Sequence, residues 1–454
     1  MSAPTAADPA RRPTGAPVVA VIGGGQLARM MQEEASALGI HLRALVEAPD
    51  GSTAQVVVDA PVGAADDAVA VRALVAGAGA AEEATATRAQ SLAPADVLTF
   101  EHEHQDSELL ATLVGEGVRV HPGPDALLLA RDKIAMRRAM ARIDAPQPAW
   151  AEVSGTVQQI RAGIEDLAAR HGWPLVLKTP RGGYDGHGVL LVRSAAELDD
   201  GEAATWISAT AAAGAGRSGG PAAGGGGSLG GAAVTSLLVE QAVPFTRELA
   251  VLLARSPSGE TAVWDVVESR QVDGMCAEVI APAPGLDSDA AALARATALA
   301  VAERFDVTGV LAVELFAVET AGEPTRLFVN ELAMRPHNSG HWTQDGALTS
   351  QFAQHLRAVL DLPLGSTEPT AATTVMVNVL GGEREPLAGA WARALAADPA
   401  ARIHLYGKQW RPGRKLGHVN VTVPGDPSAA SAPEAVDEAL RRARAVVAVL
   451  RGEA

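Results

Sequence analysis

The sequence predicts an N-terminal α/β domain followed by a larger α+β body. The first part of this prediction depends on an apolar, β-branched run at residues 18–22, with glycines and an amphipathic stretch directly after it. The second part depends on pairs of apolar segments that recur beyond residue 236 with a helical stretch between them. A chain of 454 residues with 48% hydrophobic residues has enough apolar material for two to four domains.

The N-terminal domain is expected at residues 18–122. Val18–Ile22 is typical of a buried parallel strand, and the helix that begins at Gln26 reaches Gly39, a suitable C-terminal cap. Further strands are expected at residues 42–46, 97–100 and 118–121, before the Pro-Gly-Pro sequence that ends the domain. Residues 1–17 lack an apolar segment, so we expect a disordered tail rather than a signal peptide.

The larger body is expected to have two parts, at residues 123–243 and 244–454. A helix at residues 126–142 leads into the first part. Residues 209–233 are mostly glycine and alanine without apolar periodicity, which predicts a flexible insertion. The remaining segments are expected to form strands at 237–241, 248–253, 310–318 and 327–332 and helices at 289–304 and 435–450.

Composition excludes several classes of function. A net charge of −16 argues against a nucleic-acid or anionic-membrane partner, although local basic clusters can still bind anionic substrates. One cysteine excludes an internal disulfide and a cysteine-based metal cluster. No apolar run is long enough to span a membrane. We therefore expect a cytoplasmic protein that acts on small molecules.

The first glycine-rich loop resembles a dinucleotide-binding fingerprint. Gly23, Gly25 and Ala28 lie between a strand and a helix, and Glu47 ends the second strand, where such a fold places its ribose-binding acid. Glycines let the backbone approach a phosphate, and a helix N-terminus offers free N–H groups to an anion. The pattern favours phosphate binding, with a nicotinamide cofactor or a plain tight turn as alternatives.

A second glycine-rich loop predicts a nucleotide site. Lys178 ends an apolar segment, and four glycines follow within residues 182–188 before the next apolar segment. A loop of this kind between antiparallel strands can fold over a triphosphate while the lysine adds positive charge. Residues 238–243 can offer backbone groups to an adenine ring, and Glu248 can accept from ribose hydroxyls. An ordinary hairpin with solvated charges is the alternative.

Two glutamates within apolar segments predict a metal site. Glu314 lies in residues 310–316 and Glu331 in residues 327–332. A carboxylate in such a segment is costly unless it is paired or bound to a cation. Two of them on neighbouring strands can hold Mg²⁺ against phosphate oxygens. The alternative is a salt bridge for each, for instance to Arg326 or Arg335.

Three polar motifs, at residues 182–186, 330–343 and 411–418, indicate a protein family. Together they closely resemble the 5-(carboxyamino)imidazole ribonucleotide synthase family of ATP-grasp enzymes. The likeness covers residues 18–423 and includes residues 23–27 and 99–103. It implies an ATP-grasp fold with a Rossmann-like pre-ATP-grasp N-terminal domain, and a homodimer.

The resemblance also implies site residues. The expected nucleotide-binding residues are Lys133, Lys178, Gly183, Tyr184, Asp185, Gly186, His187, Gly188, Val189, Glu240, Gln241, Ala242, Val243, Glu248, Gln271, Asn330 and Glu331. The expected ligands of Mg²⁺ (or Mn²⁺) are Glu314 and Glu331. The expected substrate-binding residues are Gln26, Glu101, His337, Asn338, Lys408, Arg414 and Lys415. The expected catalytic residues are Tyr184, Asp185, Glu101 and Arg335.

This chain departs from the family pattern at two positions. Gln271 stands where some members have a histidine that contacts ATP, so that contact is open. Ala333 stands where ATP-grasp enzymes often have an asparagine metal ligand. The metal site therefore rests on two carboxylates, phosphate oxygens and water.

The implied reaction belongs to de novo purine biosynthesis. ATP would phosphorylate bicarbonate to carboxyphosphate, and the amine of aminoimidazole ribonucleotide would capture the carboxyl group, directly or through CO₂, with release of ADP and phosphate. Residues 182–188 would act as a lid, and Asp185 or Glu101 would accept the amine proton. The alternatives are another ATP-grasp ligase, such as a formate-dependent one, a nicotinamide oxidoreductase, and a non-catalytic binding protein.

Overall fold

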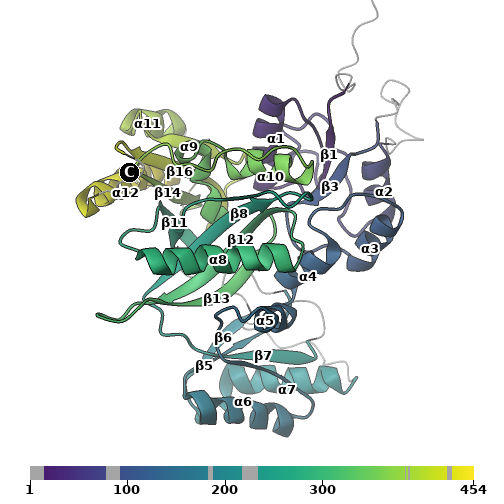
Figure 1. The fold of residues 1–454 in the computed structure, drawn as a ribbon, viewed down its shortest axis with the longest axis vertical. Helices are drawn as coiled ribbons and strands as arrows, with labels where there is room; N and C mark the ends of the chain where they lie inside the picture. Colours follow the sequence, from purple (N-terminus) through teal and green to yellow (C-terminus); the bar gives the residue numbers. More distant parts are fainter. Residues whose placement is uncertain are drawn as a thin grey trace, which may run out of the picture.

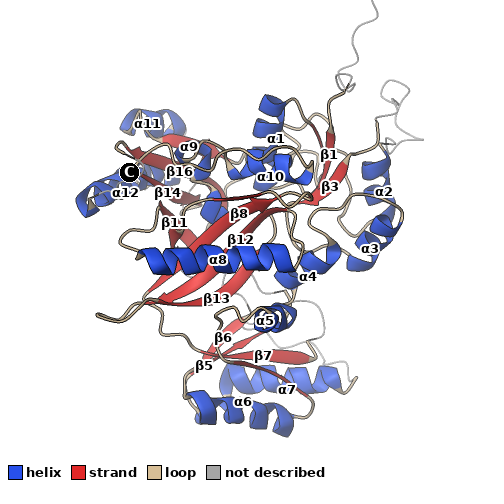
Figure 2. Ribbon diagram, in the orientation of Figure 1, coloured by secondary structure: helices blue, strands red, loops and turns tan. Residues whose placement is uncertain are grey.

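Three β-sheets organise the part of the chain that the computed structural model describes. That part comprises residues 15–77, 93–182, 188–216, 234–272, 274–383, 385–386, 389–426 and 432–453. The sheets have three, four and nine strands. Helices lie against each of them, and the nine-stranded sheet runs through the middle of the molecule (Figure 2). The predicted combination of α/β and α+β architecture is confirmed.

The N-terminal domain contains the predicted parallel sheet. Its elements are β1 (Val18–Ile22), α1 (Gln26–Leu38), β2 (His41–Leu45), α2 (Ala68–Ala76), β3 (Val97–Phe100) and α3 (Ser107–Gly115). The strand order is β2-β1-β3, and Gly39 caps α1 in the left-handed region with φ 69°. The strand expected at 118–121 is wrong, because only Val120 bridges to Leu98. The chain then reaches Pro122, which has no N–H to extend the ladder.

Two short helices connect this domain to the rest, where the sequence predicted one. They are α4 (Pro124–Arg131) and α5 (Lys133–Arg142). Asp132 separates them with φ −125° and ψ 106°, and its side chain accepts hydrogen bonds from the N–H groups of Ile134 and Ala135. An aspartate in this extended conformation caps the second helix and prevents continuation of the first. The expected single helix at 126–142 is therefore wrong.

The four-stranded sheet forms the small domain at the bottom of Figure 1. Its elements are β4 (Trp150–Ser154), α6 (Val157–His171), β5 (Leu175–Lys178), β6 (Val189–Val192), a 3₁₀ turn (Ala195–Leu198), α7 (Gly201–Gly214) and β7 (Ser236–Gln241), with strand order β4-β7-β5-β6. Residues 209–214 continue α7, which corrects the predicted start of the insertion. Alanine is a strong helix former, and Thr210 is fully buried. Residues 217–233 of the predicted insertion lie outside the described residues.

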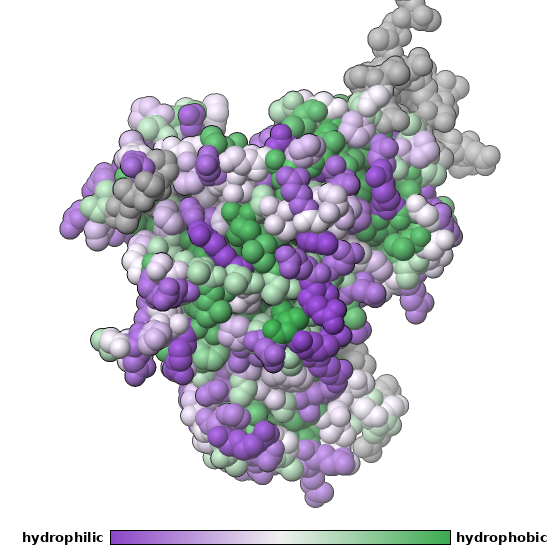
Figure 3. All heavy atoms as spheres, in the orientation of Figure 1, coloured by the Kyte–Doolittle hydropathy of each residue, from purple (hydrophilic) through white to green (hydrophobic). Residues whose placement is uncertain are grey.

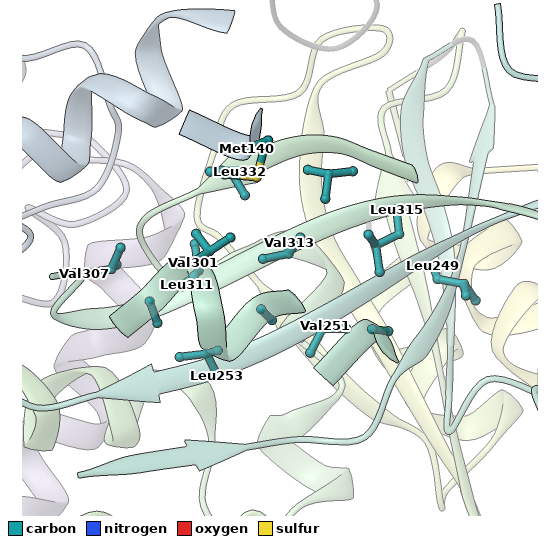
Figure 4. Close-up of a cluster of buried hydrophobic side chains, with 14 of the residues drawn as sticks. Met140, Leu249, Val251, Leu253, Val301, Val307, Leu311, Val313, Leu315 and Leu332 are labelled. Atoms are coloured by element: carbon teal, nitrogen blue, oxygen red, sulfur yellow. The ribbon is translucent and has the colours of Figure 1, made fainter. Parts of the chain in front are cut away.

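The nine-stranded sheet supplies the largest core. Its strands are β8 (Arg247–Arg255), β9 (Thr261–Val263), β10 (Val267–Val272), β11 (Met275–Ala281), β12 (Gly309–Val318), β13 (Arg326–Ala333), β14 (Thr373–Leu380), β15 (Arg402–Leu405) and β16 (Lys415–Val423). The order is β13-β12-β8-β10-β11-β14-β16-β15, with β9 paired to β8. Helix α8 (Ser288–Arg304) covers β8, β12 and β13, and its Val301 packs in one buried cluster with Val313 and with Met140 of α5 (Figure 4).

The remaining helices pack against the large sheet or against one another, and one of them also contacts α1. They are α9 (Thr343–Gly346), α10 (Gln351–Val359), α11 (Ala390–Ala397) and α12 (Pro433–Arg451), with a 3₁₀ turn at Asn338–Gly340. Figure 3 shows a surface on which hydrophilic and hydrophobic residues are interspersed. Among the described residues, no helix combines the length and apolar character needed to cross a membrane. This arrangement places β5 and β7 of the small sheet opposite β12 and β13 of the large one.

Candidate active site

A cleft of about 1020 Å³ is lined by residues of both sheets. This volume is typical of a site for a ligand as large as a nucleotide. The cleft collects many of the predicted nucleotide, metal and substrate residues: Lys133, Lys178, Val189, Glu240, Gln241, Ala242, Val243, Glu248, Gln271, Glu314, Asn330, Glu331, Arg335, His337, Asn338 and Lys415. Segments more than 200 residues apart in the sequence therefore meet at one site.

Lys178 lies at the end of β5 with its ammonium group inside the cleft wall. Its Nζ is 2.8 Å from Oε2 of Glu240 and donates to Oδ1 of Asn330 at 3.3 Å. Burial lowers the pKa of Lys178, and the charge of Glu240 opposes this shift. Burial raises the pKa of Glu240, but the charges of Lys178 and Arg137 outweigh burial and bring this pKa to about 2. The Glu240 side chain thus forms ion pairs with two buried cations.

The two predicted metal ligands face each other across β12 and β13. Glu314 and Glu331 are register partners in this antiparallel pair. Burial, and then the nearby carboxylates of Glu331 and Glu248, raise the pKa of Glu314 to about 8. The alternative of a salt bridge for each glutamate holds in part: Glu331 pairs with Nζ of Lys133 at 3.5 Å, rather than with Arg326 or Arg335. Glu314 lies 3.5 Å from Nε2 of His337.

This carboxylate pair fits a hard divalent cation. Burial lowers the pKa of His337 to about 3, so its neutral ring does not neutralise Glu314. A buried acid whose pKa is raised by other carboxylates gains from a bound cation. Within the described ranges, no group of three or more His, Cys, Asp or Glu side chains could enclose a metal by itself. Two carboxylates that leave positions open for phosphate oxygens and water suit Mg²⁺.

Gln271 lies beside Glu248, on the cleft wall. Its Nε2 donates to Oε2 of Glu248 at 2.9 Å. Burial raises the pKa of Glu248 to about 7. At the position where the resemblance allowed a histidine contact to ATP, this chain therefore has an amide that orients the neighbouring carboxylate.

A carboxylate of the chain itself occupies the first glycine loop. Glu101 accepts a short hydrogen bond from the N–H of Gly25 and another from the N–H of Leu27 at 2.9 Å. A Cβ added at Gly25 would lie 2.3 Å from Oε1 of Glu101, so the glycine is needed for this approach. A phosphate at this loop would have to compete with Glu101 for the N–H groups of the helix N-terminus, and it stays a prediction.

A second group of predicted residues gathers around Glu101. Lys408 donates to Oε1 of Gln26, and its charge opposes the rise that burial causes in the pKa of Glu101. Arg414 donates through Nη1 to the carbonyl of Gln409 at 3.1 Å. The charges of Arg414 and Lys415 add to the effect of burial in lowering the pKa of Lys408, which places these basic groups near one another.

Arg335 connects this second group to the cleft. It lines the cleft, and its Nε lies 2.8 Å from Oε1 of Glu103. Its charge also opposes the rise that burial causes in the pKa of Glu101. Lys415 also belongs to both regions, because it lines the cleft and its charge helps to lower the pKa of Lys408. The predicted nucleotide and substrate residues thus form two adjoining regions.

Five predicted residues of the second glycine loop, from Gly183 to His187, lie outside the described residues. They include the candidate catalytic residues Tyr184 and Asp185. The base of the loop is described: β5 and β6 pair antiparallel, with Lys178 opposite Val189, and the N–H of Thr179 donates to the carbonyl of Gly188 at 3.0 Å. The predicted antiparallel strands on either side of the loop are confirmed, and the predicted lid stays a prediction.

Sequence reasoning missed three features of the site. Arg137 forms the second ion pair of Glu240, and Glu103 pairs with Arg335. Phe245 and Phe316 stack at the cleft with ring centroids 4.5 Å apart. Only Arg137 had a readable signal, because it follows Lys133 by four residues and so lies on the same face of α5.

Comparison with known proteins agrees with this geometry. Family models match the ribonucleotide synthetase preATP-grasp domain at residues 17–131, the ATP-grasp domain at residues 139–352, and the phosphoribosylaminoimidazole carboxylase C-terminal domain at residues 374–431. The N5-carboxyaminoimidazole ribonucleotide synthase of Mycobacterium bovis is 44% identical over 408 residues, which cover 89% of this chain and 83% of the relative.

Solved structures extend the likeness to the whole architecture. The ADP complex of an N5-carboxyaminoimidazole ribonucleotide synthetase has a TM-score of 0.75 at 31% identity and covers 96% of this chain and 97% of its own. The Aspergillus clavatus N5-carboxyaminoimidazole synthase, in complex with ADP and 5-aminoimidazole ribonucleotide, has a TM-score of 0.74 at 27% identity and covers 96% and 98%. The chain therefore belongs to the N5-carboxyaminoimidazole ribonucleotide synthase family of ATP-grasp ligases.

Proposed function

We propose that this protein uses ATP and bicarbonate to carboxylate the exocyclic amine of 5-aminoimidazole ribonucleotide in purine biosynthesis, releasing ADP and phosphate. The observation that carries the proposal is that the nucleotide cleft and the basic group around Glu101 adjoin in one site. A nucleotide-sized cleft with Lys178 and the Glu314–Glu331 pair continues, through Arg335, into a basic group around Glu101. The names of the relatives support the same reaction.

The nucleotide would occupy the cleft between the two sheets. Lys178 would meet its phosphates, and the backbone of residues 240–243 would meet the adenine edge. Glu248, held by Gln271, would accept from the ribose hydroxyls. The predicted nucleotide residues that line the cleft support this assignment.

Glu314 and Glu331 would hold Mg²⁺, with Mn²⁺ as an alternative. The cation would neutralise charge on the phosphate oxygens of the nucleotide. The fit rests on the register pairing of Glu314 with Glu331, which places a largely buried carboxylate beside a second one. Lys133, 3.5 Å from Glu331, would fix the orientation of the second carboxylate.

The ribonucleotide would occupy the region around Glu101, Lys408 and Arg414. The three basic side chains Lys408, Arg414 and Lys415 suit its 5′-phosphate, because arginine and lysine stabilise phosphate by charge-assisted hydrogen bonds. His337 and Asn338 line the cleft at the boundary between the two regions. Bicarbonate would lie at this boundary, between the terminal phosphate and the amine.

The proposed chemistry has two steps. A bicarbonate oxygen attacks the γ-phosphorus of ATP, which gives carboxyphosphate and ADP. The amine nitrogen then attacks the carboxyl carbon, the C–O bond to phosphate breaks, and the amine loses one proton to Glu101 or Asp185. Arg335 would stabilise the anionic carboxyphosphate. The chain mainly positions the reactants and excludes water, which would hydrolyse the mixed anhydride.

Three further assignments are part of the proposal. They are assembly as a homodimer, action in the cytoplasm, and a division into an N-terminal domain at 18–122, a small domain at 123–243 and a body at 244–454. Light scattering on the purified chain measures the first. A mass of one 46.4 kDa chain would contradict the dimer.

Omission of single reactants tests the proposed reaction. Mg²⁺, ATP, bicarbonate and aminoimidazole ribonucleotide should together give rapid ADP release, and leaving out any one should abolish it. Formate in place of bicarbonate tests the rival ligase, and NADH fluorescence titration tests a nicotinamide enzyme. Equal turnover without the ribonucleotide, or with formate alone, would refute the proposal.

A further inference from the structure

Arg137 lies buried at the junction between the two sheets. It is 0% exposed and belongs to α5, which Figure 1 shows between the small sheet and the large one. Its Nε donates to Oε1 of Glu240 in β7 at 2.5 Å. Its Nη1 and Nη2 donate to the carbonyls of Val329 and Asn330 in β13 at 2.6 and 3.2 Å. One side chain therefore ties a strand of each cleft wall to the same helix.

These contacts close a ring of four residues. Arg137 contacts Glu240, Glu240 contacts Lys178 at 2.8 Å, and Lys178 donates to Oδ1 of Asn330 at 3.3 Å. The backbone carbonyl of Asn330 accepts from Nη2 of Arg137, which completes the ring. Lys178, Glu240 and Asn330 line the cleft, and Arg137 lies behind them. Arg137 does not line the cleft itself, so it acts on a ligand through the residues that it holds in place.

The charges of the ring show what Arg137 contributes. With Arg137 present, two buried cations share one carboxylate, so the ring keeps a net positive charge for an anionic ligand. Without Arg137, Lys178 and Glu240 would form an isolated neutral pair. The carbonyls of Val329 and Asn330 would also lose their buried donors, which costs free energy and loosens the strand that carries Glu331.

We infer that Arg137 is a positioning residue for the nucleotide, holding Lys178 through Glu240 and holding the Asn330–Glu331 segment through its backbone. This inference rests on the proposed function only in placing ATP in the cleft. Because Arg137 contacts the nucleotide region and not the group around Glu101, its loss should weaken nucleotide binding and spare ribonucleotide binding.

The test compares Arg137→Gln and Arg137→Lys with Arg138→Gln. Arg138 is a matched control, since it is the next residue of the same helix and its side chain is 62% exposed in a surface pair with Glu152. Calorimetric titration with MgADP alone measures nucleotide affinity without turnover. Steady-state kinetics then give the KM of the ribonucleotide, and circular dichroism gives Tm.

Arg137→Gln should weaken MgADP binding about tenfold or more, while the KM of the ribonucleotide stays within about twofold. Arg137→Lys should recover most of the affinity, because it restores a cation beside Glu240. Arg138→Gln should match the wild type. MgADP affinity within about twofold of wild type in folded Arg137→Gln would overturn the inference. So would equal losses in both substrates together with a lowered Tm that Arg137→Lys does not correct.

If Arg137→Gln does not fold, Arg137→Met replaces it, because methionine fills buried volume and leaves Lys178 and Glu240 as a neutral ion pair. The same two outcomes apply to it. The wild type separates this inference from the proposed function. Wild-type protein that binds MgADP but carboxylates nothing refutes the function, and the variants still decide the role of Arg137.

Discussion

Binding of MgADP should release a proton from Glu314. Burial and the neighbouring carboxylates raise the pKa of Glu314 to about 8. At pH 7 an acid with this pKa is protonated in about nine molecules of ten, and at pH 9 in about one of ten. A metal ligand must be ionised, so cation binding should expel about 0.9 proton at pH 7 and about 0.1 at pH 9.

Calorimetry in two buffers of different ionisation enthalpy measures this release. Preformed MgADP is titrated at pH 7 and at pH 9, and the difference between buffers gives the number of protons. Glu314→Gln, which has no proton to lose, is the control. No proton release at pH 7, or the same release from Glu314→Gln, would refute a metal site at this carboxylate.

The raised pKa of Glu314 also fixes the sign of a stability effect. The folded protein binds this proton more tightly than the unfolded chain, whose glutamate titrates near its ordinary value of 4.5. The contribution of Glu314 to stability is therefore complete below pH 4.5 and is lost as the pH rises through about 8. Mg²⁺ with ADP should raise Tm most at the alkaline end of this range.

Three substitutions test other parts of the site. Arg414→Ala should raise the KM of the ribonucleotide about 30-fold or more and leave MgADP affinity within a few-fold, and an unchanged KM would remove Arg414 from the site. Gly25→Ala should displace Glu101, since its Cβ would lie 2.3 Å from that carboxylate, and raise the same KM; unaltered kinetics would show that Glu101 need not stay there. Glu331→Gln should lower kcat by about 100-fold or more with little change in Tm, because its partly exposed pair with Lys133 contributes little to stability. Full activity with a lowered Tm would instead make Glu331 a structural residue.

Local signals made much of the fold predictable. The strand at Val18–Ile22 and the helix from Gln26 to its Gly39 cap follow from periodicity and capping within a few residues. The break at Asp132 had a local signal too, an aspartate two residues before the first N–H that it caps. The apolar pattern that continues across the break concealed it. The glycine content of the whole segment 209–233 concealed the helix that alanine favours in residues 209–214.

Pairings distant in sequence explain what could not be predicted. Arg137 and Glu240 are 103 residues apart, and nothing near either residue indicates the other. The same holds for Glu101, which lies 74 residues from Leu27 and accepts from an N–H group that the glycine pattern offered to a phosphate. The facing positions of Glu314 and Glu331 were predictable, because each carboxylate lies in an apolar segment, where it is costly unless it is paired or bound to a cation. The bound Mg²⁺ stays a prediction.

Isotope transfer from bicarbonate tests the central claim most directly. Bicarbonate labelled with ¹³C and ¹⁸O is mixed with Mg²⁺, ATP and aminoimidazole ribonucleotide, and the products are followed by ¹³C and ³¹P NMR. If the protein carboxylates the amine through carboxyphosphate, a ¹³C carbamate signal on the ribonucleotide should grow with ADP, and each phosphate released should carry one ¹⁸O from bicarbonate. ADP formation without ¹³C on the ribonucleotide, or phosphate free of ¹⁸O, would contradict the account.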